Sequence, residues 1–302
     1  MGQEHKILVA GVTGQVARSL ALADAPTGVT VLNAGRPELD LLDGDTVRAA
    51  IERYKPDIVV NAAAYTAVDQ AESDEDAAFA LNAAGPGRLA AGAAEHAIPI
   101  IHISTDYVFD GTKNAPYAET DPVAPLGVYG RSKLAGEQEV AAANPAHFIL
   151  RTAWVYSPFG KNFVKTMLRV GAGRDELNVV DDQCGNPTSA LDIARGILAA
   201  SAKVLNGDPA ATPGVYHMSG TGDATWADFA SFIFECSRDL GGPCAAVNRI
   251  TSAEFPTPVK RPANSRLDCQ KIADTFGVRL PDWRESAREC VETLILSGEW
   301  NS

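Results

Sequence analysis

Short apolar runs rich in β-branched residues alternate with helix-like stretches through the first half of the chain. The apolar runs lie at 6–10, 29–34, 57–64, 98–104 and 147–152, and the helix-like stretches lie at 14–23, 43–54, 75–97 and 129–143. Strands that are apolar along their whole length are buried on both faces, as in parallel sheets covered by helices. The alternation therefore predicts an α/β fold with a doubly wound parallel sheet, and Pro86 predicts a kink or break in the third helix.

The composition is that of a folded protein, and it limits the partners of the chain. Of 302 residues, 46% are hydrophobic and 21% are charged, and 26 Lys+Arg against 38 Asp+Glu give a net charge of -12. A general nucleic-acid binder needs a basic face that displaces counterions, so we expect no nucleic-acid partner. The five scattered cysteines form no CxxC pair, no apolar run reaches membrane-spanning length, and the first residues do not resemble a signal peptide. We expect a cytoplasmic protein with reduced thiols and no membrane contact.

A glycine turn follows the first apolar run, in "ILVAGVTGQVARSL". Gly11 and Gly14 come between the strand and the first helix, where glycine allows a tight turn and brings a pyrophosphate close to the helix N-terminus. Ala17 replaces the third glycine of the dinucleotide fingerprint, a position that serves helix–strand packing. Two glycines can also form a purely structural turn, but their place in a repeated β/α pattern favours a Rossmann-like dinucleotide site.

The end of the second apolar run bears on the choice of cofactor. NAD-specific sites carry Asp or Glu here to accept hydrogen bonds from the ribose hydroxyls. This chain has Asn33, followed by Arg36, and an arginine can pair with a 2′-phosphate. We therefore expect NADPH, and NADH stays open because Arg36 could equally be a solvated loop residue. Asp40 and Leu41 are candidates for contacts to the adenine.

A tyrosine and a lysine lie one helical turn apart in "LGVYGRSKLAGE". Tyr129 and Lys133 would share one face of a helix, although this spacing also arises by chance. Reduction of a carbonyl group needs an acid for the oxygen, and a nearby cation would lower the pKa of a tyrosine from its usual value of about 10. Thr105 ends the fourth apolar run, where doubly wound sheets bind ligands, and adds a donor for the oxygen. The three residues form the predicted catalytic group.

The alternation loosens after about residue 155. A helix near 188–204 is predicted to return to the sheet, Thr225 is a candidate N-cap, and the proline-rich stretch 243–268 is expected to be largely irregular. The predicted division is a dinucleotide-binding domain at 1–155, completed by the helix near 188–204, and a smaller C-terminal substrate-binding region at 156–187 and 205–302.

Longer stretches of the chain resemble one known family. These stretches are "GVTGQV", "NAAAYTAVDQAE", "STDYVFDG", "YGRSKLAGE", "RTAWVY", "NFVKTMLR", "DDQCGNPT", "RPANSRL" and "LPDW". They resemble the dTDP-4-dehydrorhamnose reductases, a family of the extended short-chain dehydrogenase/reductase superfamily. The resemblance covers essentially the whole chain, and "STDYVFDG", "NAAAYTAVD" and "RPANSRL" are far more specific than the glycine turn.

The resemblance implies NAD(P)H-dependent reduction of the C4 keto group of dTDP-4-dehydro-6-deoxy-L-mannose to dTDP-L-rhamnose. It implies Thr105, Tyr129 and Lys133 as the catalytic group and Thr105, Asp106 and Trp154 as contacts to the dTDP-sugar. The implied cofactor contacts are Gly14, Gln15, Val16, Asp40, Leu41, Ala64, Tyr65, Thr66, Ile103, Tyr129 and Lys133. Magnesium is associated with the family, sometimes at a dimer contact, so magnesium and a homodimer are further expectations. No cluster in the sequence places a metal ion.

Several of these residues also have structural interpretations. Trp154 directly follows a strand, where tryptophan is commonly part of the core, and Asp106 could cap a turn. Asn61 and Asn82 are expected to satisfy backbone groups, and His102 is expected to be a hydrogen-bonded core residue.

Two further alternatives concern the ligand and the activity. Lys260, Arg261 and Arg266 flank the proline-rich stretch, and they are either exposed cations or partners of the sugar nucleotide's diphosphate. The chain could also reduce another dTDP-4-keto-6-deoxyhexose, or serve as a non-catalytic sugar-nucleotide-binding regulatory subunit. Regulatory relatives tend to lose a member of the catalytic group, and here none is missing.

Overall fold

Six parallel strands form the central sheet of the computed structural model, which describes residues 4–301. The strands lie in the order β10-β5-β4-β3-β1-β2. Their bounds are β1 His5–Ala10, β2 Val29–Ala34, β3 Ile58–Asn61, β4 Ile100–Thr105, β5 His147–Thr152 and β10 Gly214–His217. The predicted α/β fold with a doubly wound, Rossmann-like sheet is confirmed. The direction of winding reverses between β1 and β3, the point at which such sheets bind ligands.

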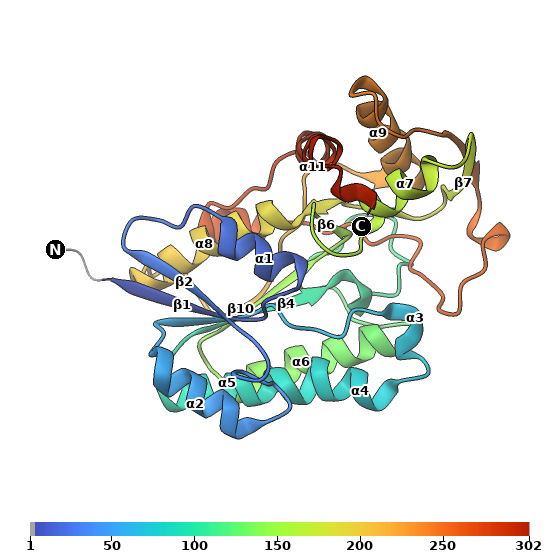
Figure 1. Cartoon of the computed structure of the whole chain (residues 1–302). Helices are drawn as coiled ribbons and strands as arrows, with labels where there is room; N and C mark the ends of the chain where they lie inside the picture. The colour runs from blue at the N-terminus through green and yellow to red at the C-terminus, as the bar shows by residue number, and fades with distance from the viewer. Residues whose placement is uncertain (1–3, 302) are drawn as a thin grey trace.

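Helices cover both faces of the sheet (Figure 1). One face carries α2 (Gly44–Tyr54), α5 (Gly85–Glu95) and α6 (Val128–Ala143), and the other carries α1 (Gln15–Leu22) and α8 (Ala190–Leu205). Within β1, Ile7 and Val9 enter the core under α1 and α8, whereas Leu8 and Ala10 enter the core under α2 and α5. Burial on both faces explains why the strands are apolar along their whole length. The predicted helix near 188–204 is confirmed as α8.

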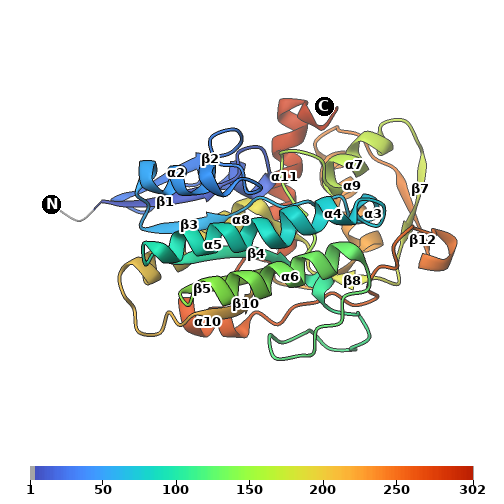
Figure 2. The same ribbon diagram turned by 90° about the horizontal axis from the view of Figure 1, so that it is seen from below.

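The predicted helix at 75–97 is continuous through Pro86 but changes its winding. It consists of α4 (Glu75–Phe79), a π-helical segment (Ala80–Ala84) and α5, and Figure 2 shows α4 and α5 in line. Pro86 lies in the first turn of α5, so the break expected there is absent and the irregularity lies in the π-helical segment before it. Gly136 of α6 packs against this segment, since a Cβ atom there would lie 2.0 Å from the carbonyl oxygen of Asn82.

The C-terminal region packs its own helices and short strands around a second core. Its helices are α7 (Phe163–Gly171), α9 (Trp226–Asp239), α10 (Gln270–Phe276) and α11 (Trp283–Ser297). Its short strands are β6 (Val155–Tyr156), β7 (Glu176–Val180), β8 (Cys184–Gly185), β9 (Thr188–Ser189), β11 (Ala224–Thr225) and β12 (Ala246–Ile250). A short helix α3 (Val68–Ala71) and 3-10 turns at Asp106–Val108, Ser252–Glu254 and Glu299–Asn301 complete the elements.

Two expectations for this region have different outcomes. Thr225 is confirmed as the N-cap of α9, because its hydroxyl accepts from the backbone N–H of Asp228 at 3.1 Å while the Asp228 carboxylate accepts from the backbone N–H of Thr225 at 3.1 Å. The stretch 243–268 is largely irregular as expected, but it also contains β12, which pairs in parallel with β7 and was not predicted. The pairing partner lies about seventy residues earlier, beyond the reach of local sequence patterns.

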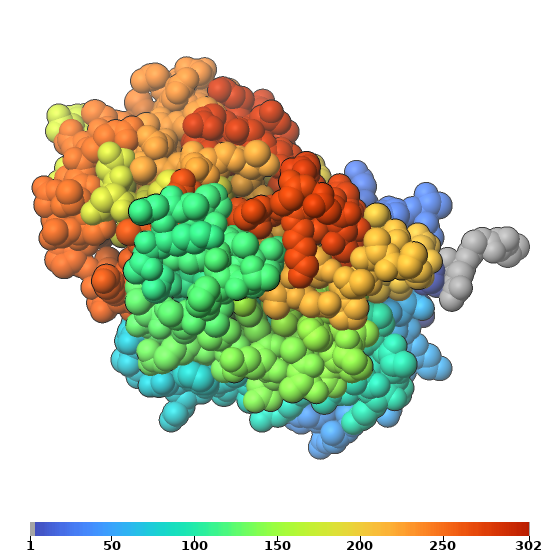
Figure 3. Space-filling model, turned by 180° about the vertical axis from the view of Figure 1, so that it is seen from behind, coloured from blue at the N-terminus to red at the C-terminus, as the bar shows by residue number. Residues whose placement is uncertain are grey.

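The C-terminal region also contributes to the central sheet. β10 pairs in parallel with β5, and α10 packs nearby, although both lie within the stretch 205–302 that was assigned to substrate binding. Seen from behind, the teal-green loop near residue 115 lies against the orange-red C-terminal part (Figure 3). There the backbone of Tyr117 donates to Arg266 and accepts from Asp268, at 2.8 Å each. Whether the two regions are separate domains stays a prediction.

Two expectations from the composition, reduced thiols and no membrane-spanning helix, can be compared with the described residues. All five cysteines are free thiols. Within residues 4–301, no helix combines the length and the apolar character needed to cross a membrane.

Candidate active site

A cavity of about 1110 Å³ lies at the carboxyl ends of β1, β3 and β4. The loop after β1, the loop after β3 and the end of β4 all line it, which places the cavity at the point where the sheet changes its direction of winding. The predicted site residues that line it are Gly11, Gly14, Gln15, Val16, Arg36, Asp40, Leu41, Ala64, Thr66, Ile103, Thr105, Asp106, Tyr129, Lys133 and Trp154. The cavity therefore brings together residues from six separate stretches of the sequence.

Tyr65 is the predicted site residue that lies outside this lining. Its backbone N–H donates to the Asn82 side chain at 2.8 Å, and the Asn82 side chain donates back to its carbonyl at 3.0 Å. Its ring packs beside Ala78 and Val128, and its hydroxyl donates to Asp74 at 3.1 Å. Asn82 thus has the structural role expected of it, and the side chain of Tyr65 is held by the neighbouring helices.

The glycine turn is built for a close backbone approach. Gly11 has φ +132, which L side chains rarely adopt. Gly14 precedes α1 and offers its first turn no side-chain cap, so the backbone N–H groups there can bind an anion. Asn33 donates to the carbonyls of Gly11 at 3.1 Å and Ala17 at 2.8 Å. Asn33 therefore stabilises the turn itself, a role that the sequence did not indicate.

Arg36 adds a cation to the end of the cavity next to this turn. Its guanidinium forms no ion pair with any other residue between 4 and 301, so it is available to an anionic ligand. Asp40 lines the same part of the cavity, and its carboxylate accepts from the backbone N–H of Leu42 at 3.0 Å. These residues and the glycine turn fit a phosphorylated dinucleotide.

The three predicted catalytic residues meet at the other part of the cavity. Thr105 ends β4, and Tyr129 and Lys133 lie one turn apart on α6. The Thr105 hydroxyl lies near the Tyr129 phenol and donates to the Asp106 carboxylate at 2.9 Å. The Lys133 ammonium donates to the carbonyl of Ile103 at 2.6 Å, which fixes the lysine against β4. The ring of Tyr107 lies edge-on to that of Tyr129, with 5.5 Å between the ring centroids.

Burial controls the titration of this pair. It raises the pKa of Tyr129 above the usual value, and the neighbouring Thr105 hydroxyl opposes this shift. Burial also lowers the pKa of Lys133 to about 8, and the carboxylate of Glu137 opposes that change. The sequence predicted that Lys133 would lower the pKa of the phenol, but desolvation is the dominant effect here. Tyr129 is therefore held in its protonated form.

A buried ion pair lies one helical turn beyond Lys133. Glu137 accepts from Arg151 at 2.7 and 2.9 Å and from the Ser104 hydroxyl at 2.5 Å. His102 lies in the same strand as Ser104, and its Nδ1 is 3.0 Å from the Asn61 side chain. Burial and then the charge of Lys133 lower the pKa of His102, so the ring is neutral. Its Nε2 has no partner among residues 4–301, so the core histidine is only half hydrogen-bonded.

Asp106 and Trp154 line the part of the cavity beyond Thr105. Burial raises the pKa of Asp106 to about 6, while hydrogen bonds from Thr105 and Ser265 oppose the shift. Trp154 has φ +47 and stacks on Trp226 with centroids 3.5 Å apart and planes 7° apart. The two interpretations of Trp154 are thus compatible, because one face of the indole packs in the C-terminal core while the residue also lines the cavity.

The basic residues near the proline-rich stretch do not line the cavity. Arg261 pairs with Asp69 at 3.3 Å, and Arg266 pairs with Asp223 at 3.1 Å. The cations that do line it are Arg36, Lys133 and Lys161. The sequence did not single out Lys161, and the signal for it was a Gly-Lys pair in the loop "SPFGKN", which directly follows β6.

No cluster of metal-ligating side chains accompanies this site. Across residues 4–301, no three His, Cys, Asp or Glu side chains are gathered so that they could hold a metal ion. The magnesium expected from the family resemblance is therefore not supported by a ready-made cluster in this part of the chain, and it stays a prediction.

The fold is Rossmann-like, and the sequence relatives place the chain among the reductases of the short-chain dehydrogenase/reductase type. Residues 5–296 match the family model described as the RmlD substrate binding domain. The chain belongs to this family, the dTDP-4-dehydrorhamnose reductases.

Named relatives resemble the chain over nearly its whole length. A dTDP-4-dehydrorhamnose reductase of Sinorhizobium fredii is 50% identical over 97% of this chain and 99% of its own. The crystal structure of a dTDP-4-dehydrorhamnose reductase from Clostridium acetobutylicum superposes with a TM-score of 0.88 at 40% identity, covering 96% of this chain and 99% of that one. The Bacillus anthracis enzyme, in complex with NADP, gives a TM-score of 0.87 at 32% identity, covering 96% and 100%.

Proposed function

We propose that this protein reduces the C4 keto group of dTDP-4-dehydro-6-deoxy-L-mannose to give dTDP-L-rhamnose, with NADPH as the preferred reductant. The observation that carries the proposal is the meeting of Thr105, Tyr129 and Lys133 in one cavity with the glycine turn. The relatives named above supply the substrate class, since their printed names refer to this reaction.

The cofactor half of the cavity supports a phosphorylated dinucleotide. When bound, NADPH supplies the hydride for the reduction. Gly11 and Gly14 allow the backbone to approach the pyrophosphate, and the uncapped first turn of α1 donates to it. Arg36 has no ionic partner among the described residues, and it would neutralise a 2′-phosphate. This favours NADPH over NADH.

The catalytic group donates the proton that the substrate oxygen needs during the reduction. Because burial keeps Tyr129 protonated, its phenol can donate to the substrate oxygen as that oxygen becomes an alkoxide. The positive charge of Lys133 stabilises the phenolate that this donation leaves, and its ammonium can also hold a ribose hydroxyl. Thr105 lies beside the phenol in the same cavity, and its hydroxyl is assigned a share in the hydrogen bonding of the developing oxyanion.

Replacement of the phenol tests the mechanism directly. Tyr129→Phe removes the proton donor and retains the ring, so keto reduction should fall by roughly a hundredfold or more. The affinity for NADPH, measured by fluorescence titration, should change less than about threefold because the phosphate-binding residues are untouched. Turnover of the variant at the wild-type rate would exclude Tyr129 as the acid.

Product analysis separates this function from its alternatives. NADPH and NADH are offered separately with the keto sugar, with and without magnesium, and the product is identified by NMR. Formation of dTDP-L-rhamnose supports the proposal, and the opposite C4 configuration or a preference for another keto sugar would identify a related reductase. If none of these sugars causes oxidation of NADPH, the alternative of a non-catalytic regulatory subunit is favoured. The homodimer, the magnesium requirement and the cytoplasmic location stay predictions.

A further inference from the structure

Lys161 lies in the loop between β6 and α7, and it lines the cavity. It is exposed, and no carboxylate among residues 4–301 pairs with its ammonium group. The charged residues of the described chain that line the cavity are three cations and two carboxylates, namely Arg36, Lys133, Lys161, Asp40 and Asp106. Since the whole chain has a net charge of -12, this local excess of positive charge indicates an anionic ligand.

The loop that carries Lys161 is fastened to the first turn of α1. The side chain of Gln15, which begins α1, accepts from the Ser157 hydroxyl at 2.7 Å and from the Asn162 side chain at 3.1 Å. Gly160 lies against the same side chain, because a Cβ atom there would be 3.7 Å from Cγ of Gln15. Lys161 therefore stands between two residues that contact the start of α1.

Further contacts give the loop backbone a defined place. The Asn162 side chain donates to the carbonyl of Ser157 at 2.7 Å, and Asn162 also caps α7. One turn further along α1, the guanidinium of Arg18 lies over the ring of Phe159, 4.2 Å from its centroid. The position of Lys161 is thus fixed by its neighbours, although its own side chain is exposed.

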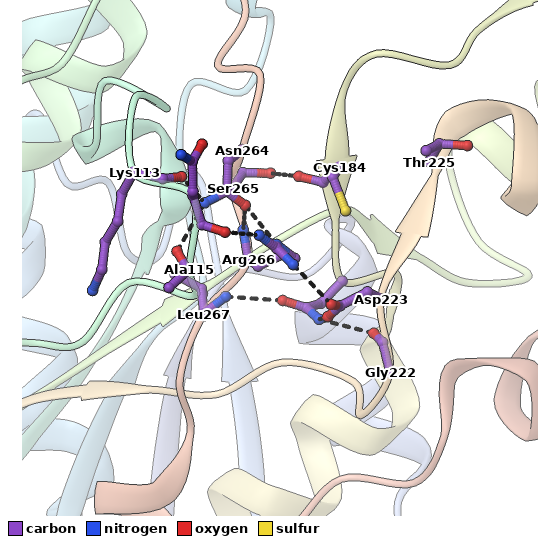
Figure 4. Close-up of polar contacts among 12 residues, drawn as sticks. Lys113, Ala115, Cys184, Gly222, Asp223, Thr225, Asn264, Ser265, Arg266 and Leu267 are labelled. Carbon is purple, nitrogen blue, oxygen red and sulfur yellow. Dashed lines mark hydrogen bonds and ion pairs between the residues drawn. The ribbon is translucent and has the colours of Figure 1, made fainter.

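Arg266, a cation of the proline-rich stretch, is engaged elsewhere. Figure 4 shows Arg266 joined to Asn264 and Asp223, at 2.8 and 3.1 Å. Its guanidinium also donates to the carbonyl of Asn114 at 2.6 Å, so it ties the C-terminal region to the loop after β4 and does not line the cavity. The cation that the described C-terminal region brings to the cavity is Lys161.

We propose that Lys161 binds the pyrophosphate of the dinucleotide cofactor. The inference rests on the proposed function, which places NADPH in this cavity. The backbone N–H groups at the uncapped start of α1 would bind the pyrophosphate, and the loop at Lys161 is attached to the same turn through Gln15. The flexible four-carbon stem of a lysine carries a point charge, which suits a phosphate group without requiring one fixed orientation.

The sugar nucleotide is the other source of a diphosphate in this cavity. The residues assigned to it, Asp106 and Trp154, have no printed contact with the loop at Lys161, whereas Gln15 has three contacts with that loop. The cofactor is therefore the ligand that the geometry favours, and separate titrations distinguish the two sources.

Calorimetric titration of the enzyme without sugar tests the assignment. Lys161→Ala should raise the Kd for NADP+ and for NAD+ alike by roughly fivefold, because both carry the pyrophosphate. Arg36→Ala should weaken NADP+ alone, since NAD+ has no 2′-phosphate. Lys161→Arg retains the charge, so its Kd values should stay within about twofold of the wild type. Lys6→Ala is the matched control, because Lys6 is an exposed lysine at the opposite end of β1 from the cavity.

The Kd for dTDP, measured with saturating NADP+, should change less than about twofold in Lys161→Ala. A loss of dTDP affinity with unchanged dinucleotide affinity would overturn the proposal in favour of the sugar nucleotide. A loss confined to NADP+, or an equal loss in Lys6→Ala, would overturn it as well. If the wild type binds NADP+ without reducing the keto sugar, the proposed function fails while these Kd values still test Lys161.

Discussion

Lys133 carries its charge inside the protein, next to the residue that it assists. Only 2% of its surface is exposed, and burial lowers its pKa to about 8. Glu137 lies one turn further along α6 and raises the pKa of Lys133, and Arg151 in turn neutralises Glu137. His102, the other titratable group at this lysine, is kept neutral. The charge on the lysine thus depends on a carboxylate that does not touch the cavity.

We predict that keto reduction declines as the pH rises through about 8, because Lys133 then loses its proton. Glu137→Gln removes the carboxylate that raises the pKa of Lys133 and leaves the positive charge of Arg151 without its partner. The lost attraction and the unpaired positive charge both lower the pKa of Lys133 further. The alkaline limb of the pH–rate profile should therefore move to lower pH, and losing one partner of the buried pair should cost about 3–5 kcal/mol of stability. Ser104→Ala removes only an uncharged hydrogen bond to Glu137, so the alkaline limb of its pH–rate profile should not move. An unmoved limb in Glu137→Gln would contradict this account.

Some residues of the site could be predicted from the sequence, and others could not. Thr105, Tyr129 and Lys133 were predicted together because strand ends and helical spacing are local patterns. Asn33 was interpreted as a cofactor-facing residue, but it binds the carbonyls of the glycine turn. Ser265 was not singled out, because Trp154, whose indole N–H donates to its hydroxyl, lies more than a hundred residues earlier. Contacts between distant segments have no local signature.

Among the elements, α6 packs closely against neighbouring backbone at two of its glycines. Gly136 lets this helix approach the π-helical segment so closely that a Cβ atom would lie 2.0 Å from a backbone oxygen. Gly130 makes a similar approach, with 2.3 Å to the carbonyl oxygen of Tyr107. Since Tyr129 and Lys133 lie on the same helix, these contacts set the distance of the catalytic group from β4.

We predict that Gly136→Ala destabilises the protein by roughly 3 kcal/mol or more, because backbone must shift to admit the methyl group. The Tm should fall by about 5 °C or more in calorimetry. Keto reduction at 25 °C should also fall, since the shift moves α6. Gly173→Ala is the matched control, as a Cβ atom there meets nothing within 4 Å. Equal Tm values for the two variants would show that α6 accommodates the group.

The elements of the first half were predictable, and those of the second half were less so. β2 and β5 have the predicted bounds because buried parallel strands are apolar throughout. β10 is too short and too weakly patterned to be recognised, and β12 exists only because it pairs with β7. The π-helical segment follows from close packing against α6, which proline placement alone does not reveal.

At the scale of the whole molecule, buried titratable groups set the response to acid. Burial lowers the pKa of His217 from 6.5 to about 3, and it lowers that of His102 well below 6.5. In acid the unfolded chain takes up protons that these folded histidines do not, so stability is lost as the pH falls below about 6.5. Asp106 acts in the opposite sense, because its pKa is raised to about 6 and the folded protein takes up the proton.

We predict that the free energy of unfolding decreases between pH 7.5 and pH 5, since two histidines outweigh one carboxyl group. Each histidine contributes at most about 1.4 kcal/mol per pH unit. Urea unfolding at several pH values measures the slope. His217→Gln removes one of the two groups, so its slope should be distinctly smaller whatever its absolute stability. A wild type that is equally stable at both pH values would refute the prediction.

The place of β10 at the sheet border has a consequence for the way the protein is made. A nascent chain that has left the ribosome only as far as β5 presents that strand as an open edge until residues 214–217 arrive. During this interval the emerging sheet can pair with other chains, and a chaperone or rapid synthesis would protect it. A gene truncated near residue 155 would for the same reason direct the synthesis of insoluble inclusion bodies instead of an isolated nucleotide-binding half.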